Sequence, residues 1–183
     1  MDKVEPIKNR EDVNRILTVL KLHNERNYLL AVYGFNSGLR ISDILNLKVK
    51  DIKGKNYFTV TEKKRGHKRD IPITPSIKRL TNPYIANKSD DEYLFKSREG
   101  FNKPIGRVQA YNIIKKAAKE AGIKQNIGTH SLRKTFAYHL LKDTGNIVYV
   151  QEILGHSSID VTKRYLGIDL DELESSIKRL NFI

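Results

Sequence analysis

Apolar residues recur at helical spacing in several stretches of the chain. The first stripe consists of Val13, Ile16, Leu17 and Leu20. Its spacing of three and four residues after Asn9 predicts a helix that this asparagine caps. We expect a second helix at Arg26–Asn36, ended by Gly38, and a third that Ser42 caps and that runs through Leu47. These bounds place Arg40 in a tight turn between two helices.

The middle of the chain changes to a strand-like pattern. Alternating side chains at Asn56–Thr61 predict a strand, and Asp70–Thr74 is typical of a returning one. We expect a hairpin at the edge of its sheet, because Pro72 cannot donate a ladder hydrogen bond. Its predicted tip holds five fixed cations: Lys63, Lys64, Arg65, Lys68 and Arg69. The polar segment Thr81–Lys103 is predicted to be a loop, with room for a third short strand at Tyr93–Phe95.

The second half of the chain returns to helical periodicity. One clean stripe, ended by Gly122, consists of Ala110, Ile113, Ile114, Ala117, Ala118 and Ala121. Further helices are expected at Ser131–Lys142, at Ile147–Leu154, and from Ser157 or Ser158 through Tyr165. The tail, residues 168–183, repeats Leu170, Leu173, Ile177 and Leu180 on an otherwise polar helix. Without an internal repeat or linker, residues 1–183 are predicted to form one domain, mainly α with a small antiparallel β-sheet.

Composition narrows the function classes. The 183 residues carry a formal net charge of +13 and contain no cysteine. A disulfide scaffold, a thiol nucleophile and a zinc-thiolate site are therefore excluded. We expect a soluble, cytoplasmic protein with no membrane association, because no stretch approaches the length of an apolar membrane span and the N-terminus lacks a signal-peptide pattern. The charge by itself leaves nucleic acid, an anionic membrane surface and plain solubility open.

Candidate chemistry is confined to four segments, each of which carries at least one arginine or lysine. The sequence has no HExxH, P-loop, GxGxxG or paired-carboxylate motif, so the common signatures of metalloproteases, nucleotide-binding proteins and hydrolases are absent. What remains is GLRISDILNL, EKKRGHKR, THSLRKTFAYH and LGHSSIDVTKRY. In the third, His130 and Arg133 lie three residues apart on one face of a helix N-terminus, which favours a phosphate.

Taken singly, each of these residues also has an ordinary structural explanation. His130 and Arg133 fit a solvated basic helix start, and His156 fits a polar residue at a helix end. Tyr165, among apolar neighbours, fits a core aromatic. Single residues therefore leave the function undecided.

In order and at their spacing, the four segments closely resemble the catalytic domain of tyrosine recombinases, the phage integrase family. The resemblance runs from Arg40 to Tyr165 and implies the catalytic-domain fold of that family. It assigns the catalytic roles to Arg40, Lys64, His130, Arg133, His156 and Tyr165. Lys63 is the only rival for the lysine role. Ser131 and Lys134 stand where the family often has Asp and His, which puts the subfamily in doubt more than the activity.

The resemblance implies a site-specific recombinase that cleaves and rejoins DNA strands through a 3′-phosphotyrosyl intermediate. Arg40 and Arg133 would grip the non-bridging phosphate oxygens, which the negative charge of the transition state requires. His130 would take the phenolic proton, Lys64 would protonate the departing 5′ oxygen, and His156 would bond the phosphate. No metal, cofactor or ATP is then needed.

The implied partners are double-stranded DNA and further copies of the chain, normally four protomers on two duplexes. The expected DNA-contacting residues are Lys63, Arg65, Lys68, Arg69 and Lys134. The tail helix is expected to dock on a neighbouring protomer, or else to fold back on its own core. The N-terminal DNA-clamping domain of most family members is expected to be absent, because the first helix begins within about ten residues of Met1. Such a chain would be an excised fragment or a separate catalytic domain, with weak, salt-sensitive and poorly specific DNA binding.

Two other functions remain open at this point. The first is a non-catalytic basic DNA-binding module in which Tyr165 is merely packed. The second is a metal-dependent nuclease using His67, His130 and His156, which lacks support because the sequence has no paired-carboxylate motif to complete a metal site. The resting position of Tyr165 relative to the arginines is likewise open.

Overall fold

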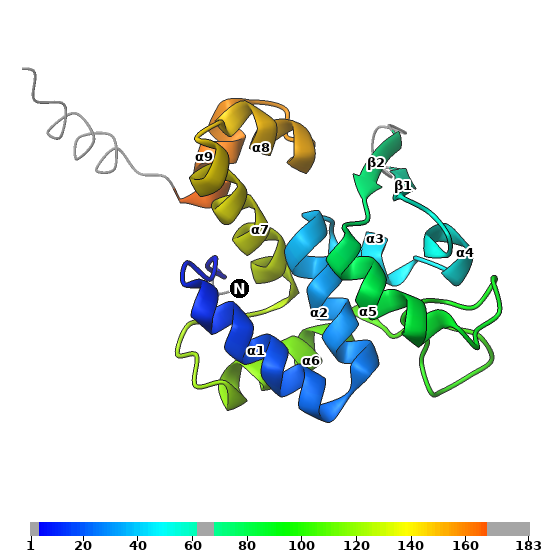
Figure 1. Ribbon diagram of the computed structural model, residues 1–183. Coiled ribbons are helices and arrows are strands. Elements are labelled where there is room, and N and C mark those ends of the chain that lie inside the picture. Colours follow the sequence, from blue (N-terminus) through cyan, green and yellow to red (C-terminus); the bar gives the residue numbers. More distant parts are fainter. Residues whose placement is uncertain (1–3, 62–67, 168–183) are drawn as a thin grey trace, which may run out of the picture.

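Helices and one small hairpin make up the fold in the computed structural model, which describes residues 4–61 and 68–167. The elements are α1 (Arg10–His23), α2 (Glu25–Ser37), α3 (Ile41–Leu45), α4 (Val49–Ile52), β1 (Tyr57–Thr61), β2 (Lys68–Pro72), α5 (Pro75–Ile85), α6 (Arg107–Glu120), α7 (Thr129–Thr144), α8 (Ile147–Leu154) and α9 (Ile159–Leu166). The fold is thus mainly α with a small antiparallel sheet, which confirms the predicted class (Figure 1).

The ends of the first two helices follow the sequence signals. The Asn9 side chain accepts a hydrogen bond from the Glu11 amide and caps α1 as predicted. Gly38 ends α2 in the left-handed region with φ 63°. A Cβ at this glycine would lie 2.5 Å from the Phe136 ring, so the turn needs glycine for space as well as for its dihedral angle.

The third helix differs from the prediction at both ends, and it ends at Leu45 rather than at Leu47. Its N-cap is Arg40, whose extended backbone lets its carbonyl accept from the amides of Asp43 and Ile44 at 2.9 and 3.2 Å. Ser42 lies inside the helix and bonds the Asp43 side chain, so the prediction that Ser42 is the cap is wrong. Arg40 does lie in the turn between two helices, as the sequence indicated.

The hairpin is an antiparallel pair whose register runs from Tyr57 opposite Pro72 to Thr61 opposite Lys68. The second strand begins two residues earlier than predicted, which moves Lys68 and Arg69 out of the tip and into β2. Placing these two cations at the tip was wrong, because the inward–outward alternation that buries Ile71 extends back to them. The remaining tip cations, Lys63, Lys64 and Arg65, lie outside the described residues.

Two helices were missed, and the predicted loop Thr81–Lys103 begins too early. Helix α5 extends to Ile85; the Thr74 side chain accepts from the Ile77 amide, and Pro75 occupies the first turn. Short α4 covers part of the hairpin base. The predicted third strand reduces to an isolated bridge between Lys48 and Tyr93.

The later helices agree with the predictions within two residues. Helix α7 begins at Thr129, which brings His130 into its first turn. Helix α8 has the predicted bounds, and Ser158 rather than Ser157 caps α9 by accepting from the Val161 amide. The tail stripe predicted at Leu170–Leu180 lies outside the described residues.

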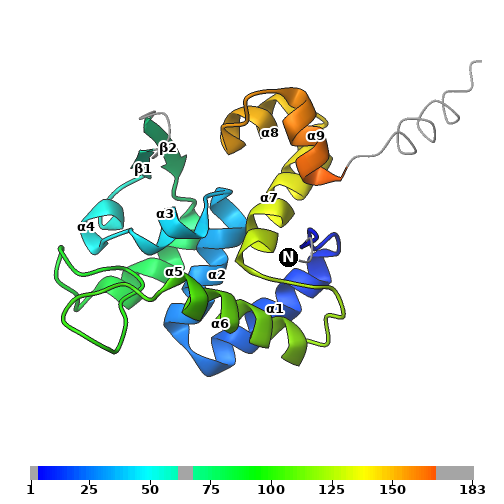
Figure 2. The same ribbon diagram turned by 180° about the vertical axis from the view of Figure 1, so that it is seen from behind.

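The core is divided unequally. Two large apolar clusters join α1–α6, the hairpin and the first turns of α7. A small third cluster consists of Ala137, Val150, Leu154 and Leu166. It holds α8 and α9 against the far part of α7, away from α6 in both views (Figures 1 and 2). Among the described residues, no helix is long and apolar enough to cross a membrane.

Candidate active site

Arg133 joins the large and small parts of the molecule. It lies in the first half of α7 and is buried, with only 3% of its surface exposed. Nη1 donates to the Gly38 carbonyl at 2.5 Å, and Nη2 donates to the Leu154 carbonyl at 2.6 Å. The guanidinium therefore spans from the α2–α3 turn to the C-terminal end of α8.

Arg40 brings a second guanidinium to the same place. It is exposed and follows Gly38, the partner of Arg133, by two residues. Burial lowers the pKa of Arg133, and the positive charges of Arg40 and Arg69 lower it further. Because this effect falls off with distance, the charged groups of Arg40 and Arg133 lie close enough together to interact.

Tyr165 lies within this cluster. Its hydroxyl is buried and has no hydrogen-bond partner of good geometry among the residues that the structure describes. Its ring centroid is 6.1 Å from that of His130 and 5.0 Å from that of His156, both edge-on. Burial raises the pKa of Tyr165, while the neighbouring charge and hydrogen-bonding contact of Arg133 and the charge of Arg40 oppose that rise.

The two histidines are shifted toward their neutral forms. His156 follows Gly155, whose left-handed backbone ends α8 at φ 62° and turns the chain toward α9. Burial, followed by the charges of Arg133 and Arg40, lowers the pKa of His156 to about 4. Partial burial also lowers the pKa of His130, with further contributions from Arg133 and nearby cations. Both rings are therefore neutral at pH 7 in the free protein.

The remaining predicted cations are distributed unequally. Arg69 of β2 donates through Nη1 to the Glu152 carbonyl of α8 at 3.3 Å. Its positive charge contributes to the lowered pKa of Arg133. Lys134 is buried, with Nζ 5.3 Å from the Tyr165 ring centroid. Lys68 is exposed on β2. Lys64 and its rival Lys63 lie outside the described residues.

The sequence interpretation underestimated three features of this site. Arg69 was expected only as a general DNA contact, whereas it lies beside Arg133 and bonds α8. The carbonyls of Gly38 and Leu154, which hold the Arg133 guanidinium, carry no side-chain signal. Thr162, whose hydroxyl lies 3.0 Å from His156 Nδ1, lies in the segment LGHSSIDVTKRY but was not assigned a role there.

Metal-binding groups do not gather here. The described part of the chain contains no group of three or more His, Asp or Glu side chains placed to hold a metal ion. Of the histidines suggested for a nuclease, His130 and His156 both face Tyr165, and His67 lies outside the described residues. The cationic side chains are what this cluster offers to a phosphate.

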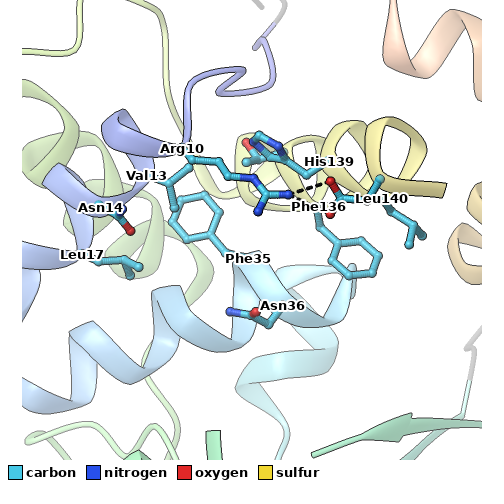
Figure 3. Close-up of a pocket in the computed structure, with 11 residues that line it drawn as sticks. Arg10, Val13, Asn14, Leu17, Phe35, Asn36, Phe136, His139 and Leu140 are labelled. Atoms are coloured by element: carbon cyan, nitrogen blue, oxygen red, sulfur yellow. Dashed lines mark hydrogen bonds and ion pairs between the residues drawn. The ribbon is translucent and has the colours of Figure 1, made fainter. Parts of the chain in front are cut away.

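A separate cavity of about 530 Å³ lies between α1, α2 and α7 (Figure 3). Phe35 and Phe136 contribute to its wall, and Arg10 pairs with Asp143 across it at 2.7 Å. None of the described candidate residues lines this cavity. The candidate site is accordingly a cluster at another part of α7, distinct from this hollow.

Comparison with known proteins is consistent across sequence and structure. Residues 9–171 match the phage integrase family. The chain is 44% identical over 178 residues to the probable integrase/recombinase YoeC of Bacillus subtilis (strain 168), covering 97% of each protein. It is 32% identical to the tyrosine recombinase XerA of Pyrococcus furiosus, covering 94% of this chain and 61% of that protein. It therefore spans about three fifths of the XerA relative.

Solved structures show the same fold. The crystal structure of XerA recombinase superposes with a TM-score of 0.78 at 23% identity, covering 98% of this chain and 65% of that one. The catalytic domain of bacteriophage HP1 integrase superposes with a TM-score of 0.65 at 26% identity, covering 96% of this chain and 95% of that one. The fold thus extends to relatives whose sequences are only distantly similar.

Proposed function

The chain belongs to the phage integrase family of tyrosine recombinases, and on this premise we propose that it breaks and rejoins strands of double-stranded DNA. The observation that carries the proposal is the arrangement of Arg40, Arg133 and two neutral histidines around the buried hydroxyl of Tyr165. A strand phosphate between the guanidinium groups and this hydroxyl is the substrate that such a cluster fits.

The first step is the grip on the phosphate. A guanidinium has five N–H donors, and Arg133 uses Nη1 and Nη2 to bond carbonyls that fix its plane. Its remaining donors, together with those of exposed Arg40, bind the non-bridging oxygens and stabilise the charge of the transition state. Arg69 adds a third positive charge close by.

The second step is attack by Tyr165 on phosphorus. Burial holds the phenol protonated, so the proton must leave as the oxygen–phosphorus bond forms. His130, neutral at pH 7, accepts that proton, and Lys134 beneath the ring favours the developing negative charge. His156 bonds a phosphate oxygen.

The third step releases the 5′ oxygen, which Lys64 protonates, with Lys63 as the alternative donor. The product is a 3′-phosphotyrosyl bond and a free 5′ hydroxyl. The ester energy stays in that bond, so a 5′ hydroxyl from another duplex completes strand exchange without ATP, cofactor or metal.

We further propose that four protomers act together on two duplexes, in the cytoplasm with the DNA. Lys63, Arg65 and Lys68 contact backbone phosphates. The tail, residues 168–183, docks on a neighbouring protomer through its apolar stripe. In support, the net charge of +13 favours an acidic polymer, and the tail stripe needs an apolar partner.

A suicide duplex tests the proposal. The duplex carries a nick a few nucleotides to the 3′ side of the scissile phosphate. After cleavage, the short fragment with the free 5′ hydroxyl diffuses away, so the covalent intermediate cannot religate and accumulates. We expect a covalent adduct with the parent chain in EDTA and none with Tyr165→Phe. Equal DNA binding by both proteins without any adduct would instead identify a non-catalytic DNA-binding module, and adduct-free cleavage that EDTA stops would identify a metal-dependent nuclease.

A further inference from the structure

The hydroxyl of Thr162 lies directly behind His156. Thr162 is fully buried on α9, three residues before Tyr165. Its Oγ1 is 3.0 Å from His156 Nδ1 and 3.2 Å from the carbonyl oxygen of Ser158. A buried hydroxyl thus has two polar partners within hydrogen-bond distance.

A threonine hydroxyl has one proton to donate and can also accept. When Thr162 donates to the Ser158 carbonyl, His156 Nδ1 must hold a proton and donate it to Thr162. When Thr162 instead donates to Nδ1, that nitrogen is bare and the ring proton is on Nε2. The direction of one hydroxyl therefore decides which ring nitrogen is a donor.

The two arrangements cost little to exchange. The Ser158 carbonyl also accepts from the Thr162 backbone amide at 3.3 Å, so it keeps a partner when the hydroxyl turns away. Thr162 itself remains bonded in both arrangements. Neither arrangement leaves a buried polar group without a partner, which is the condition for both to be populated.

The choice matters because the His156 ring is neutral and has a single proton. Arg133 of α7 and Arg40 of the α2–α3 turn are the cations that disfavour a second one, and Tyr165 of α9 lies against the ring. A phosphate oxygen accepts hydrogen bonds only. His156 can bond it only when Nε2 carries the proton.

We propose that Thr162 is a positioning residue that sets the tautomer of His156, an inference that rests on the proposed function. In the free protein Thr162 donates to Ser158, and His156 carries its proton on Nδ1. On binding DNA, the phosphate accepts from Nε2. Nδ1 gives its proton to solvent, Nε2 takes one from solvent, and the Thr162 hydroxyl rotates to donate to Nδ1, so the ring gains no net proton.

The test compares Thr162→Val with Thr162→Ser in the full chain labelled with ¹⁵N-histidine. Valine keeps the branched shape and loses the hydroxyl, whereas serine keeps the hydroxyl. NMR of the imidazole nitrogens reports the tautomer, with the His156 signal assigned by its loss in His156→Asn. Spectra of the bound state use each variant combined with Tyr165→Phe on an intact duplex, and cleavage by the Tyr165-containing chains is measured on the suicide duplex.

In the parent chain and in Thr162→Ser, we expect the His156 ring to carry its proton on Nδ1 without DNA and on Nε2 with DNA bound. In Thr162→Val the His156 proton is expected on Nε2 in both states, because Nδ1 has lost the hydroxyl that could accept from it. Adduct formation should still be about tenfold slower, the value of one hydrogen bond, because the ring then lacks the bond to Nδ1 that orients Nε2 toward the phosphate. The same tautomer in the free and bound parent chain, a preserved switch in Thr162→Val, or equal losses in both variants would each overturn the inference. Absence of any adduct with the parent chain would refute the proposed function instead, while the free-state spectra still test Thr162.

Discussion

The two halves of the candidate site are supported by apolar clusters of very different size. Arg40 follows Leu39 and precedes Ile44, which are buried in one of the large apolar clusters of the main body. His156 and Tyr165 belong to the α8–α9 unit, which packs on α7 through a cluster of four buried residues. The side proposed to bind the phosphate is thus anchored far more extensively than the side that carries the proposed nucleophile.

This difference indicates how the site is assembled. Few buried apolar contacts mean that α8 and α9 open at a lower free energy than the main body. Arg133 counters this tendency, because its bonds to Gly38 and Leu154 connect the two sides through one side chain. The residue proposed to bind the phosphate is therefore also the residue that connects the α8–α9 unit to the main body.

The largest effect is expected at Arg133. In Arg133→Lys the charge remains, but one ammonium cannot reach both carbonyls and the phosphate. We expect adduct formation on the suicide duplex to fall about a thousandfold. The free energy of unfolding in urea should fall by about 3 kcal/mol, because buried carbonyls lose a charged donor. A lysine variant within threefold of the parent rate would contradict the bridging role.

The small cluster should be separable from the large ones. Leu154→Ala leaves a cavity between α7, α8 and α9, with a cost of about 3 kcal/mol. Amide hydrogen exchange should then quicken in α8 and α9 while α1, α2 and α6 keep their protection. The matched control is Leu30→Ala, in a large cluster, which should lower protection throughout the main body. Uniform loss of protection in Leu154→Ala would show that the two regions unfold as one.

Gly38 tests how accurately the α2–α3 turn must be shaped. Gly38→Ala places an alanine in the left-handed backbone region and pushes its Cβ into the Phe136 ring. The control, Gly54→Ala, has a similar φ of 71° but open space around its Cβ. We expect Gly54→Ala to cost about 1 kcal/mol and Gly38→Ala about 2 to 3 kcal/mol in thermal unfolding. Only Gly38→Ala should slow adduct formation, because its carbonyl orients Arg133. Equal costs would mean that the Phe136 contact relaxes freely.

The smallest effect concerns pH. The folded state lowers the pKa of His156 from 6.5 to about 4, so in this interval the unfolded chain binds more protons than the folded one. Stability is then fully present above pH 6.5 and is lost as the pH falls toward 4. Because the ring is only half buried, we expect about 1 kcal/mol from this group. The difference between the parent chain and His156→Asn in urea unfolding at pH 7 and pH 4.5 measures it, and identical pH dependence would contradict the shift.

Much of the fold was predictable because its signals are local. Asn9 and Gly38 mark helix ends through their own side chain or backbone, and both were identified from the sequence. For α9 the sequence left Ser157 and Ser158 open, and the structure has Ser158 as the cap. Helix α5 was missed although Thr74 and Pro75 signal its start, because Pro83 and the polar residues beyond favoured a loop. Lys68 and Arg69 were misplaced because strand ends depend on pairing with a partner strand, which the sequence of one strand does not show.

The residues of the candidate site could be proposed from the sequence, whereas their arrangement could not. The resemblance named Arg40, Arg133 and Tyr165, and the structure brings them together. The carbonyl clamp on Arg133 and the nearness of Arg69 depend on backbone positions up to 95 residues apart, such as Gly38 relative to Arg133. Such long-range contacts leave no spacing pattern in the sequence.

The central claim is that the Tyr165 oxygen attacks a phosphate held by the two arginines. Protease digestion of the adduct trapped on a suicide duplex, followed by mass spectrometry, identifies the residue that carries the 3′ nucleotide. The account predicts a single modified peptide with the nucleotide on Tyr165, and its loss in Arg133→Lys. A nucleotide on any other residue, or an unmodified Tyr165 in a confirmed covalent complex, would contradict it.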